Sequence, residues 1–163
     1  MSDRLARGVL WLAAALTALI AGFFYAYACS VMPGLATVDD ATFIASMRGI
    51  NAVVRNVAFA PSFFGALVVT AVAVALHRRR LRVLPWVVAA LVLYAAAFAL
   101  TMGLNVPLNE WLATVDTTDA AGVRAAYEGP WVTWNIVRTV LSVGALACLL
   151  VAVAVRGGPP LRG

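Results

Sequence analysis

Four long apolar stretches, separated by shorter segments that contain charged residues, dominate the pattern along the chain. A helix needs about 20 mostly apolar residues to cross a hydrocarbon core of about 30 Å. Stretches of this length run over about 8–28, 53–76, 86–106 and 131–155. The pattern therefore predicts an all-α protein, a four-helix transmembrane bundle that forms a single integral membrane domain over residues 1–163. Pro61, inside the second stretch, predicts a bend in that helix.

The connections at one end of the predicted bundle carry signals for short amphipathic helices. The first has a breaker at Pro33-Gly34, a helix start at Asp39, and apolar residues at helical spacing up to Val54. We expect this helix to run on into the second span. The second connection has Pro107, a cap signal at 116–119 and a short helical turn that Gly129-Pro130 ends. Together the two connections are expected to form a lid over one end of the bundle.

The composition supports a membrane protein. Apolar residues make up 64% of the 163 residues and charged residues 12%, whereas about a quarter of a soluble domain is charged. The mean hydropathy is +0.95. The net charge of +5 comes entirely from arginine, since the chain has no lysine. Membrane topology explains this positive charge, so we expect membrane lipid as a partner and no nucleic acid.

The arginines also predict an orientation. Eight of them fall on the side shared by the two termini and the second connection, against one acid, Asp3: Arg4, Arg7, Arg78, Arg79, Arg80, Arg82, Arg156 and Arg162. The opposite side has Arg48, Arg55, Arg124 and Arg138 against six acids, Asp39, Asp40, Glu110, Asp116, Asp119 and Glu128. The positive-inside rule then places both termini in the cytoplasm of a cell with a bacterial-type cytoplasmic (inner) membrane.

The first stretch has an alternative interpretation as a cleavable signal. Arg4 and Arg7, an apolar core and Ala26-Tyr27-Ala28 before Cys29 imitate a signal peptide. The apolar run is long for a signal, and its removal would leave three spans and strand the amino terminus across the membrane. We therefore favour a first transmembrane helix.

Polar side chains inside the apolar stretches are the most informative residues, because a membrane helix carries them only at a cost. At 100 degrees per residue they form one stripe on each helix. The stripes consist of Gly22, Tyr25 and Cys29; Arg48, Asn51, Arg55 and Ser62; Tyr94, Phe98, Thr101 and Asn105; and Trp131, Trp134, Asn135, Arg138 and Ser142. All four have their polar members at the outer end, which predicts a buried polar pocket in the outer half of the bundle.

Arg138 lies about 10 Å inside its span, at 1.5 Å per residue. We expect Arg55 and Arg138 to turn inward, toward Asn105, Asn109, Asn135, Glu110 and Glu128. A plainer interpretation is also open: Trp111, Trp131 and Arg124 as anchors at the membrane surface, and the asparagines with Arg138 as an interhelical hydrogen-bond network. His77, beside a run of arginines, is expected to contact lipid headgroups, and Arg55 lies near enough to the boundary to do the same.

Two paired motifs resemble a known family. The motifs are Asn105-Val106-Pro107-Leu108-Asn109 and the segment 131–139, which reads Trp-Val-Thr-Trp-Asn-Ile-Val-Arg-Thr. Segments 31–35 and 43–51 are similar to the same family. The resemblance is to the anthrone oxygenase-like family of small membrane proteins and extends from about Leu16 to Val153. It implies a four-span bundle and, from the fungal members, oxidation of an anthrone to an anthraquinone by dioxygen without a cofactor.

Anthrone oxidation requires removal of a proton from an activated CH2, reaction of the enolate with dioxygen, and collapse of a peroxide to the quinone. For this chemistry we predict Arg138 and Asn105 as catalytic residues that stabilise the enolate oxygen, and Glu110 as general base. Arg55, Asn51, Asn109 and Asn135 are predicted to bind the polar groups of the substrate. Trp134, Tyr25 and Phe98 are predicted to wall its planar rings.

Two other kinds of function stay open at this point. The polar cluster could hold together a non-enzymatic scaffold or accessory subunit, and a homo-oligomer is compatible with the sequence. The pocket could also bind a lipid or a small quinone-like aromatic molecule without turnover. Neither Cys29 nor Cys148 has a neighbour that indicates a disulfide or a zinc site, and the single histidine excludes centres that need several.

Overall fold

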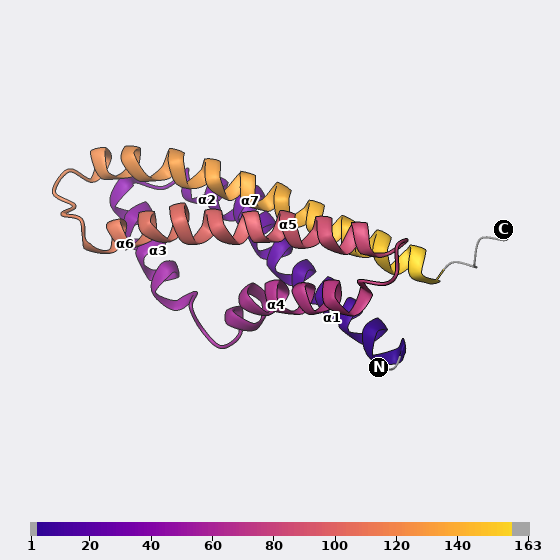
Figure 1. The fold of residues 1–163 in the computed structure, drawn as a ribbon. Helices are drawn as coiled ribbons and strands as arrows, with labels where there is room; N and C mark the ends of the chain where they lie inside the picture. The colour runs from indigo at the N-terminus through magenta and orange to yellow at the C-terminus, as the bar shows by residue number, and fades with distance from the viewer. Residues whose placement is uncertain (1–2, 158–163) are drawn as a thin grey trace.

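The computed structural model describes residues 3–157, and every secondary-structure element in this range is a helix. The first half has α1 (Asp3–Ala26), the π-helical turn η1 (Tyr27–Val31), α2 (Met32–Leu35), α3 (Asp40–Val53) and α4 (Phe59–His77). The second half has α5 (Leu84–Leu100), the π-helical turn η2 (Thr101–Asn105), α6 (Val106–Thr114) and α7 (Ala120–Gly157). Figure 1 shows both described chain ends at one end of the molecule and α3 and α6 at the other. Arg162, counted above for the orientation, lies outside the described residues.

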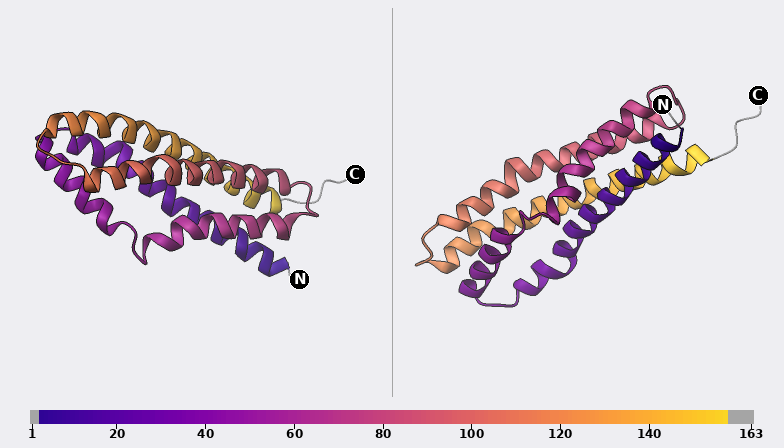
Figure 2. Two further views of the ribbon diagram at one scale, coloured as in Figure 1. Left: turned by 60° about the vertical axis from the view of Figure 1, so that its left-hand side comes forward. Right: turned by 90° about the horizontal axis from the view of Figure 1, so that it is seen from below.

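Four helical stretches are long and apolar enough to cross a membrane, which confirms the all-α class and the four predicted spans. They are Asp3–Leu35, Phe59–His77, Leu84–Thr114 and Ala120–Arg156. The long helices pack in the order α1, α4, α5, α7, and α7 returns to α1 (Figure 2). Large apolar side chains such as Leu19, Val92 and Val140 remain more than 60% exposed on the outer faces. These faces suit contact with lipid rather than with water.

Small residues allow the long helices to approach one another closely. Ala13, Ala66, Ala90 and Ala145 are fully buried where the helices meet, and small side chains at such contacts are typical of membrane helices. A second core lies at the far end, where α3, α6 and the start of α7 pack around Phe43, Met47, Leu112 and Tyr127. The protein is therefore built as a long helical body with a separately packed end.

The prolines interrupt the helices less than the sequence predicts. The helix ends just after the predicted breaker at Pro33-Gly34, because α2 stops at Leu35 and α3 begins only at Asp40. Pro107 does not interrupt the helical path, which runs from η2 into α6. A π-helical turn precedes each of these prolines, η1 before Pro33 and η2 before Pro107. The wider π-turn accommodates the proline ring and does not require the N–H that proline lacks. In the interior of an α-helix the ring clashes and a hydrogen bond is lost. The predicted stop at Gly129-Pro130 is wrong, since Pro130 lies inside α7.

A break that the sequence does not predict lies between α3 and α4, at residues 54–58. The side chain of Asn56 donates to the carbonyl oxygen of Val53 at 2.8 Å and accepts from the backbone N–H groups of Ala58 and Phe59 at 2.9 and 3.0 Å. One amide thus ends α3 and caps α4. The predicted continuous helix is therefore wrong, and so is the bend at Pro61, which falls in the first turn of α4 where no backbone N–H is needed. Figure 2 shows the sharp turn that results.

Two arginines hold α3 against the rest of the molecule. Arg48 donates to the carbonyl oxygens of Leu112 and Val115 at 2.8 and 2.7 Å, at the end of α6. Arg124 pairs with Asp40 and Glu128 at 3.0 and 2.7 Å and donates to backbone carbonyls beyond α2. The prediction of Arg124 as a surface anchor is therefore wrong.

The start of α3 is capped as the sequence predicts. The carboxylate of Asp39 accepts from the hydroxyl and the backbone N–H of Thr42 at 2.6 and 2.9 Å. These bonds, led by that from the hydroxyl, hold the pKa of Asp39 below its ordinary value because they favour the charged carboxylate. The cap fixes where α3 begins, and thereby sets which of its faces meets α7.

The opposite end of the long helices is closed by a polar cluster, which we call the terminal cluster: Asp3, His77, Arg80 and Arg156. His77 is fully buried, with Nδ1 at 2.8 Å from the carbonyl oxygen of Ala73 and Nε2 against Arg156. Asp3 accepts from Arg156 at 2.8 Å and also from Arg80. The predicted headgroup role of His77 is wrong, because packing of α1, α4 and α7 encloses its ring.

Candidate functional site

A cavity of about 320 Å³ lies where α1, α4, η2 and α7 meet below the packed end. This volume is within the range of small-molecule sites, about 300–1,000 Å³. One part of the wall is aromatic: Phe23, Phe24, Tyr27, Phe59, Phe63, Phe64 and Trp131. The other part is polar: Asn51, Arg55, Thr101, Asn105, Asn109 and Arg138. Val54, Ala60, Met102 and Val106 complete it.

The guanidinium of Arg138 is the buried charge in this wall. Its residue is 5% exposed, and its Nε and Nη2 donate to the Oδ1 of Asn135 at 3.1 and 2.9 Å. The guanidinium lies over the ring of Phe24 at 4.2 Å and near that of Trp131 at 5.2 Å. Within residues 3–157, none of the ion pairs includes Arg138, and its Nη1 has no hydrogen-bond partner. One edge of the cation is therefore fixed and the other is available to a ligand.

Asn105 supplies an acceptor to the same wall. Its residue is 1% exposed, and its Nδ2 donates to the carbonyl oxygen of Trp131 at 3.3 Å. Its Oδ1 is fully buried without a partner. A buried acceptor without a hydrogen bond costs about 1–3 kcal/mol, so such an atom calls for an explanation. Asn105 lines the cavity, and a rotation of its enclosed amide would bring this oxygen to a ligand hydroxyl.

A chain of hydrogen bonds fixes the side of the cavity next to α3. Asn51 donates to the hydroxyl of Tyr127 at 3.3 Å, and Tyr127 donates to the Oδ1 of Asn109 at 2.7 Å. Trp131 donates to the same Oδ1 at 2.8 Å. Trp131 is 3% exposed, so its predicted role as a surface anchor is wrong. The network sets the position of the indole that contacts Arg138.

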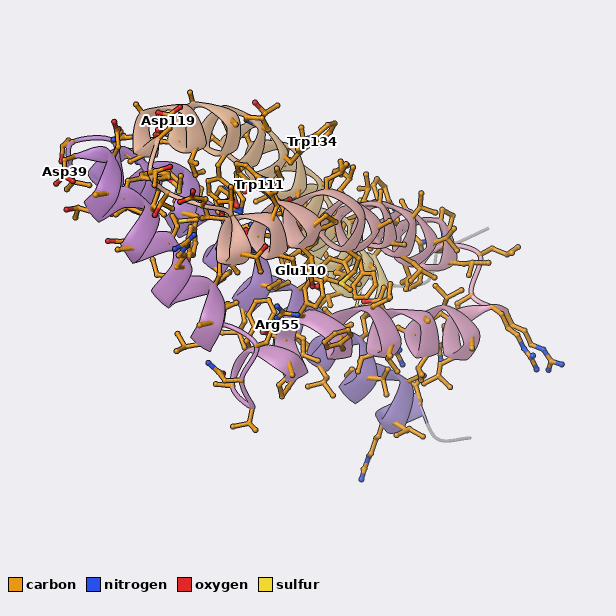
Figure 3. All side chains as sticks on the ribbon, turned by 90° about the vertical axis from the view of Figure 1, so that its left-hand side faces the viewer. Asp39, Arg55, Glu110, Trp111, Asp119 and Trp134 are labelled. Atoms are coloured by element: carbon orange, nitrogen blue, oxygen red, sulfur yellow. The ribbon has the colours of Figure 1, made fainter. Side chains whose placement is uncertain are left out.

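The exposed members of the wall mark the mouth of the cavity. Arg55 pairs with Glu110 at 3.7 Å, and their side chains are 66% and 59% exposed. Figure 3 shows the two side chains near each other, between the break after α3 and helix α6. Phe64 and Met102, at 50% and 44% exposure, belong to the same opening. The mouth thus lies on the side of the molecule, between α4 and the helical stretch from α5 to α6.

With this geometry described, the chain can be compared with known families. The model of a family described as anthrone oxygenase matches residues 53–148, more than half of the chain. The chain belongs to the anthrone oxygenase family. No curated protein and no solved structure matches it. The predicted resemblance is therefore confirmed, and the matched region includes Arg55, Asn105 and Arg138.

The cavity of this anthrone oxygenase family member contains five of the ten predicted site residues. Asn51, Arg55, Asn105, Asn109 and Arg138 line it. Arg138 is enclosed as predicted, whereas the guanidinium of Arg55 lies at the exposed mouth. Four of the five, Asn51, Arg55, Asn105 and Arg138, belong to the polar stripes of the apolar stretches, and Asn109 comes from the motif that follows the third stretch.

The other five predicted residues do not line the cavity. Asn135 lies behind Arg138 and anchors it, and its Nδ2 donates to the carbonyl oxygen of Phe24 at 3.2 Å. Phe98 stacks behind Phe63, with ring centroids 4.8 Å apart. Tyr25 is 58% exposed, and Glu110 is the exposed partner of Arg55. Trp134 points away from the side where Arg55 and Glu110 lie (Figure 3).

Sequence reasoning missed most of the aromatic wall. Phe59 and Phe63, spaced by one helical turn on α4, stack with centroids 5.3 Å apart, and Phe23 meets Phe59 at 5.2 Å. Such i, i+4 aromatic spacing was the available signal. Tyr27 also lines the cavity, one turn after Phe23. Within residues 3–157, no three His, Cys, Asp or Glu side chains gather closely enough to hold a metal ion.

Proposed function

We propose that this protein is an integral membrane oxygenase that oxidises a planar phenolic ring ketone of the anthrone type with dioxygen. The reaction takes place in the cavity that Arg138 and Asn105 line. The protein crosses the cytoplasmic membrane as a four-helix bundle with both termini in the cytoplasm, so the cavity lies in the outer half of the bilayer. The eight arginines near the termini and the second connection support this orientation.

The observation that carries the proposal is the pair formed by Arg138 and Asn105. Among residues 3–157, one is a buried cation without a carboxylate partner, and the other is a buried acceptor without a donor. A hydroxylated ring ketone supplies what both lack, an oxygen that accepts from the guanidinium and a hydroxyl that donates to the amide. The aromatic wall beside them fits flat rings.

The pair also suits the charge that develops in the reaction. When the ring CH2 loses a proton, negative charge moves to the ketone oxygen of the substrate. Arg138, held by Asn135 and shielded by aromatic rings, stabilises this enolate most strongly where water is excluded. The enolate then reacts with dioxygen at the former CH2 carbon and forms a peroxide, which collapses to the quinone.

The proposal is tested with purified protein in detergent or nanodiscs and a hydroxylated anthrone as substrate. Oxygen uptake and quinone absorbance are recorded together, and we expect one quinone for each dioxygen consumed. We expect Arg138→Gln to abolish the catalysed uptake, while the exposed Arg79→Gln keeps the wild-type rate. Both variants must elute and melt as folded protein.

Two outcomes would contradict the proposal. If the wild-type protein binds the rings but consumes no dioxygen above the uncatalysed rate, it is a binding protein for quinone-like molecules. If Arg138→Gln lowers only the yield of folded protein and leaves the rate per molecule unchanged, the buried arginine has a scaffolding role.

A further inference from the structure

We propose that the hydroxyl of Tyr27 is the proton-transfer group that converts the peroxide into the quinone. This inference rests on the proposed function. Tyr27 acts after the step for which Glu110 is predicted, and Glu110 itself lies outside the cavity wall and pairs with Arg55 at the mouth. A proton donor for the peroxide must instead come from a group that lines the cavity and whose proton is not engaged elsewhere.

Tyr27 is buried but remains open to the cavity. It begins the π-helical turn η1, is 8% exposed, and lines both the main cavity and a second one of about 420 Å³ beside it. Its ring packs against Phe23 and Trp131, with centroids 5.1 and 5.4 Å away. Within residues 3–157 its hydroxyl makes no hydrogen bond and is not among the fully enclosed unpaired atoms. A buried tyrosine hydroxyl usually has a partner, so this one is free to meet a ligand.

The other hydroxyl groups at or near the cavity are engaged. Thr101 donates to the carbonyl oxygen of Ala97 at 2.8 Å, and Tyr127 donates to Asn109 at 2.7 Å. Tyr94, in the helix body below, donates to the carbonyl oxygen of Phe63 at 2.8 Å. Tyr27 is therefore the group in the described wall whose phenolic O–H is unengaged.

Arg138 provides the electrostatic support for this role. Its guanidinium lies 5.2 Å from the ring of Trp131, the same indole against which Tyr27 packs. No carboxylate within residues 3–157 pairs with this cation. A nearby positive charge without a counter-ion offsets part of the cost of forming a transient phenolate in a buried site. The same cation thus serves the enolate first and the tyrosine afterwards.

The chemistry balances with Tyr27 as a relay. The first proton leaves the ring CH2 to water at the mouth, and the enolate adds dioxygen to give a peroxide anion on that carbon. The O–H of Tyr27 protonates the outer peroxide oxygen and leaves a phenolate. The phenolate then removes the remaining C–H proton, the C–H electron pair forms the new C=O bond, and the O–O bond breaks. The hydroxide released combines with the first proton, so an anthrone and dioxygen give a quinone and water.

The test compares Tyr27→Phe with Tyr25→Phe, its exposed neighbour two residues earlier. We expect Tyr27→Phe to lower kcat by roughly 100-fold or more, the range for lost general acid–base catalysis, with KM unchanged within about two-fold of the control. Rapid quenching and mass spectrometry should detect the substrate hydroperoxide accumulating in Tyr27→Phe only. A kcat within about two-fold of wild type, with no hydroperoxide, would overturn the proposal.

A second variant guards against a folding defect. Difluorotyrosine introduced at position 27 keeps the shape of the side chain and makes its phenol more acidic. We expect the limb of the pH–rate profile that reports this phenol to move to lower pH, which a purely structural tyrosine would not cause. An unmoved profile would overturn the proposal. If wild-type protein itself consumes no dioxygen, the proposed function fails, and this inference fails with it.

Discussion

The two ends of the long helices bury cationic side chains in different ways. At the terminal cluster, the side chain of Arg156 is 5% exposed and bonds both the carboxylate of Asp3 at 2.8 Å and the ring of His77. At the cavity, Arg138 is buried, and among residues 3–157 it hydrogen-bonds only the neutral amide of Asn135. Asn105 beside it leaves an acceptor unpaired. The first end is complete within the chain, and the second is not.

This difference distinguishes polar groups that stabilise the fold from polar groups that are available to bind a ligand. The enclosed guanidinium of Arg156 has its bonds satisfied by the half-exposed carboxylate of Asp3 and the ring of His77, so it leaves nothing for a ligand to bind. A buried charge and a buried acceptor that lack partners lower the stability of the ligand-free protein. A molecule that pairs with both gains binding free energy. The comparison predicts opposite responses to equivalent substitutions at the two ends.

The largest effect is expected from equivalent arginine substitutions. Arg138→Met should lower kcat roughly 100- to 1,000-fold, as loss of an oxyanion donor does. It should lower the unfolding temperature less than Arg156→Met does, because the methionine still packs on Phe24 and breaks no ion pair, although the Oδ1 of Asn135 loses its donors. Arg156→Met should lower the unfolding temperature and leave kcat per folded molecule unchanged. Oxygen uptake and thermal unfolding in the same detergent measure both. The reverse pattern would show that the cavity is the structural end.

The next effect contrasts two asparagines given the same replacement. Asn105→Leu should lower kcat roughly 10- to 100-fold and change the free energy of unfolding by less than about 1 kcal/mol, because it removes an acceptor that had no donor. Asn56→Leu should instead destabilise by about 1 kcal/mol, because it removes the cap of α4. Chemical unfolding and turnover assays check the pair. A stability loss at Asn105 larger than at Asn56 would argue against a ligand-binding acceptor.

A smaller effect is expected from Asn135, which positions Arg138 without lining the cavity. Asn135→Leu should lower kcat about 10-fold, within the range for one lost orienting contact, and leave KM nearly unchanged, because the guanidinium loses its anchor while the aromatic wall stays intact. Ser142→Ala, on the same helix and also buried, should change neither constant. A rise in KM with kcat unchanged would mean that Asn135 contacts the substrate directly.

The smallest effect concerns the mouth. Glu110→Gln breaks an exposed ion pair, which is worth at most about 1 kcal/mol, and should change kcat by less than about two-fold at every pH tested. The matched substitution Glu128→Gln removes a partner of the enclosed Arg124 and should reduce the unfolding temperature more. A large, pH-dependent loss of kcat in Glu110→Gln would restore Glu110 as the general base.

The hydropathy pattern was sufficient to predict the all-α class and the four membrane-length stretches, because the length of an apolar stretch is a local property of the chain. The breaks were not predictable in the same way. A proline signals a stop, and the helix does end soon after Pro33, yet α7 continues through Pro130. Asn56, which no sequence pattern marks, produces the break between α3 and α4 because its amide hydrogen-bonds two helix ends at once.

The polar part of the site could be predicted because an arginine or asparagine within an apolar stretch has few tolerable positions. That argument identified Asn105 and Arg138. It could not identify Tyr27, because a stripe counted at 100 degrees per residue selected Tyr25. The burial of Trp131 and His77 depends on contacts between helices that are distant in sequence. Both were therefore assigned to the membrane surface by the usual preference of their residue types.

The most direct test is a structure of the protein with a hydroxylated anthraquinone, the expected product, bound in a nanodisc. The account predicts the rings of the product against Phe24 and Trp131, one oxygen at the free edge of Arg138, and a hydroxyl donating to the Oδ1 of Asn105. An empty cavity at saturating product, or a product bound only on the outer helix faces, would contradict it.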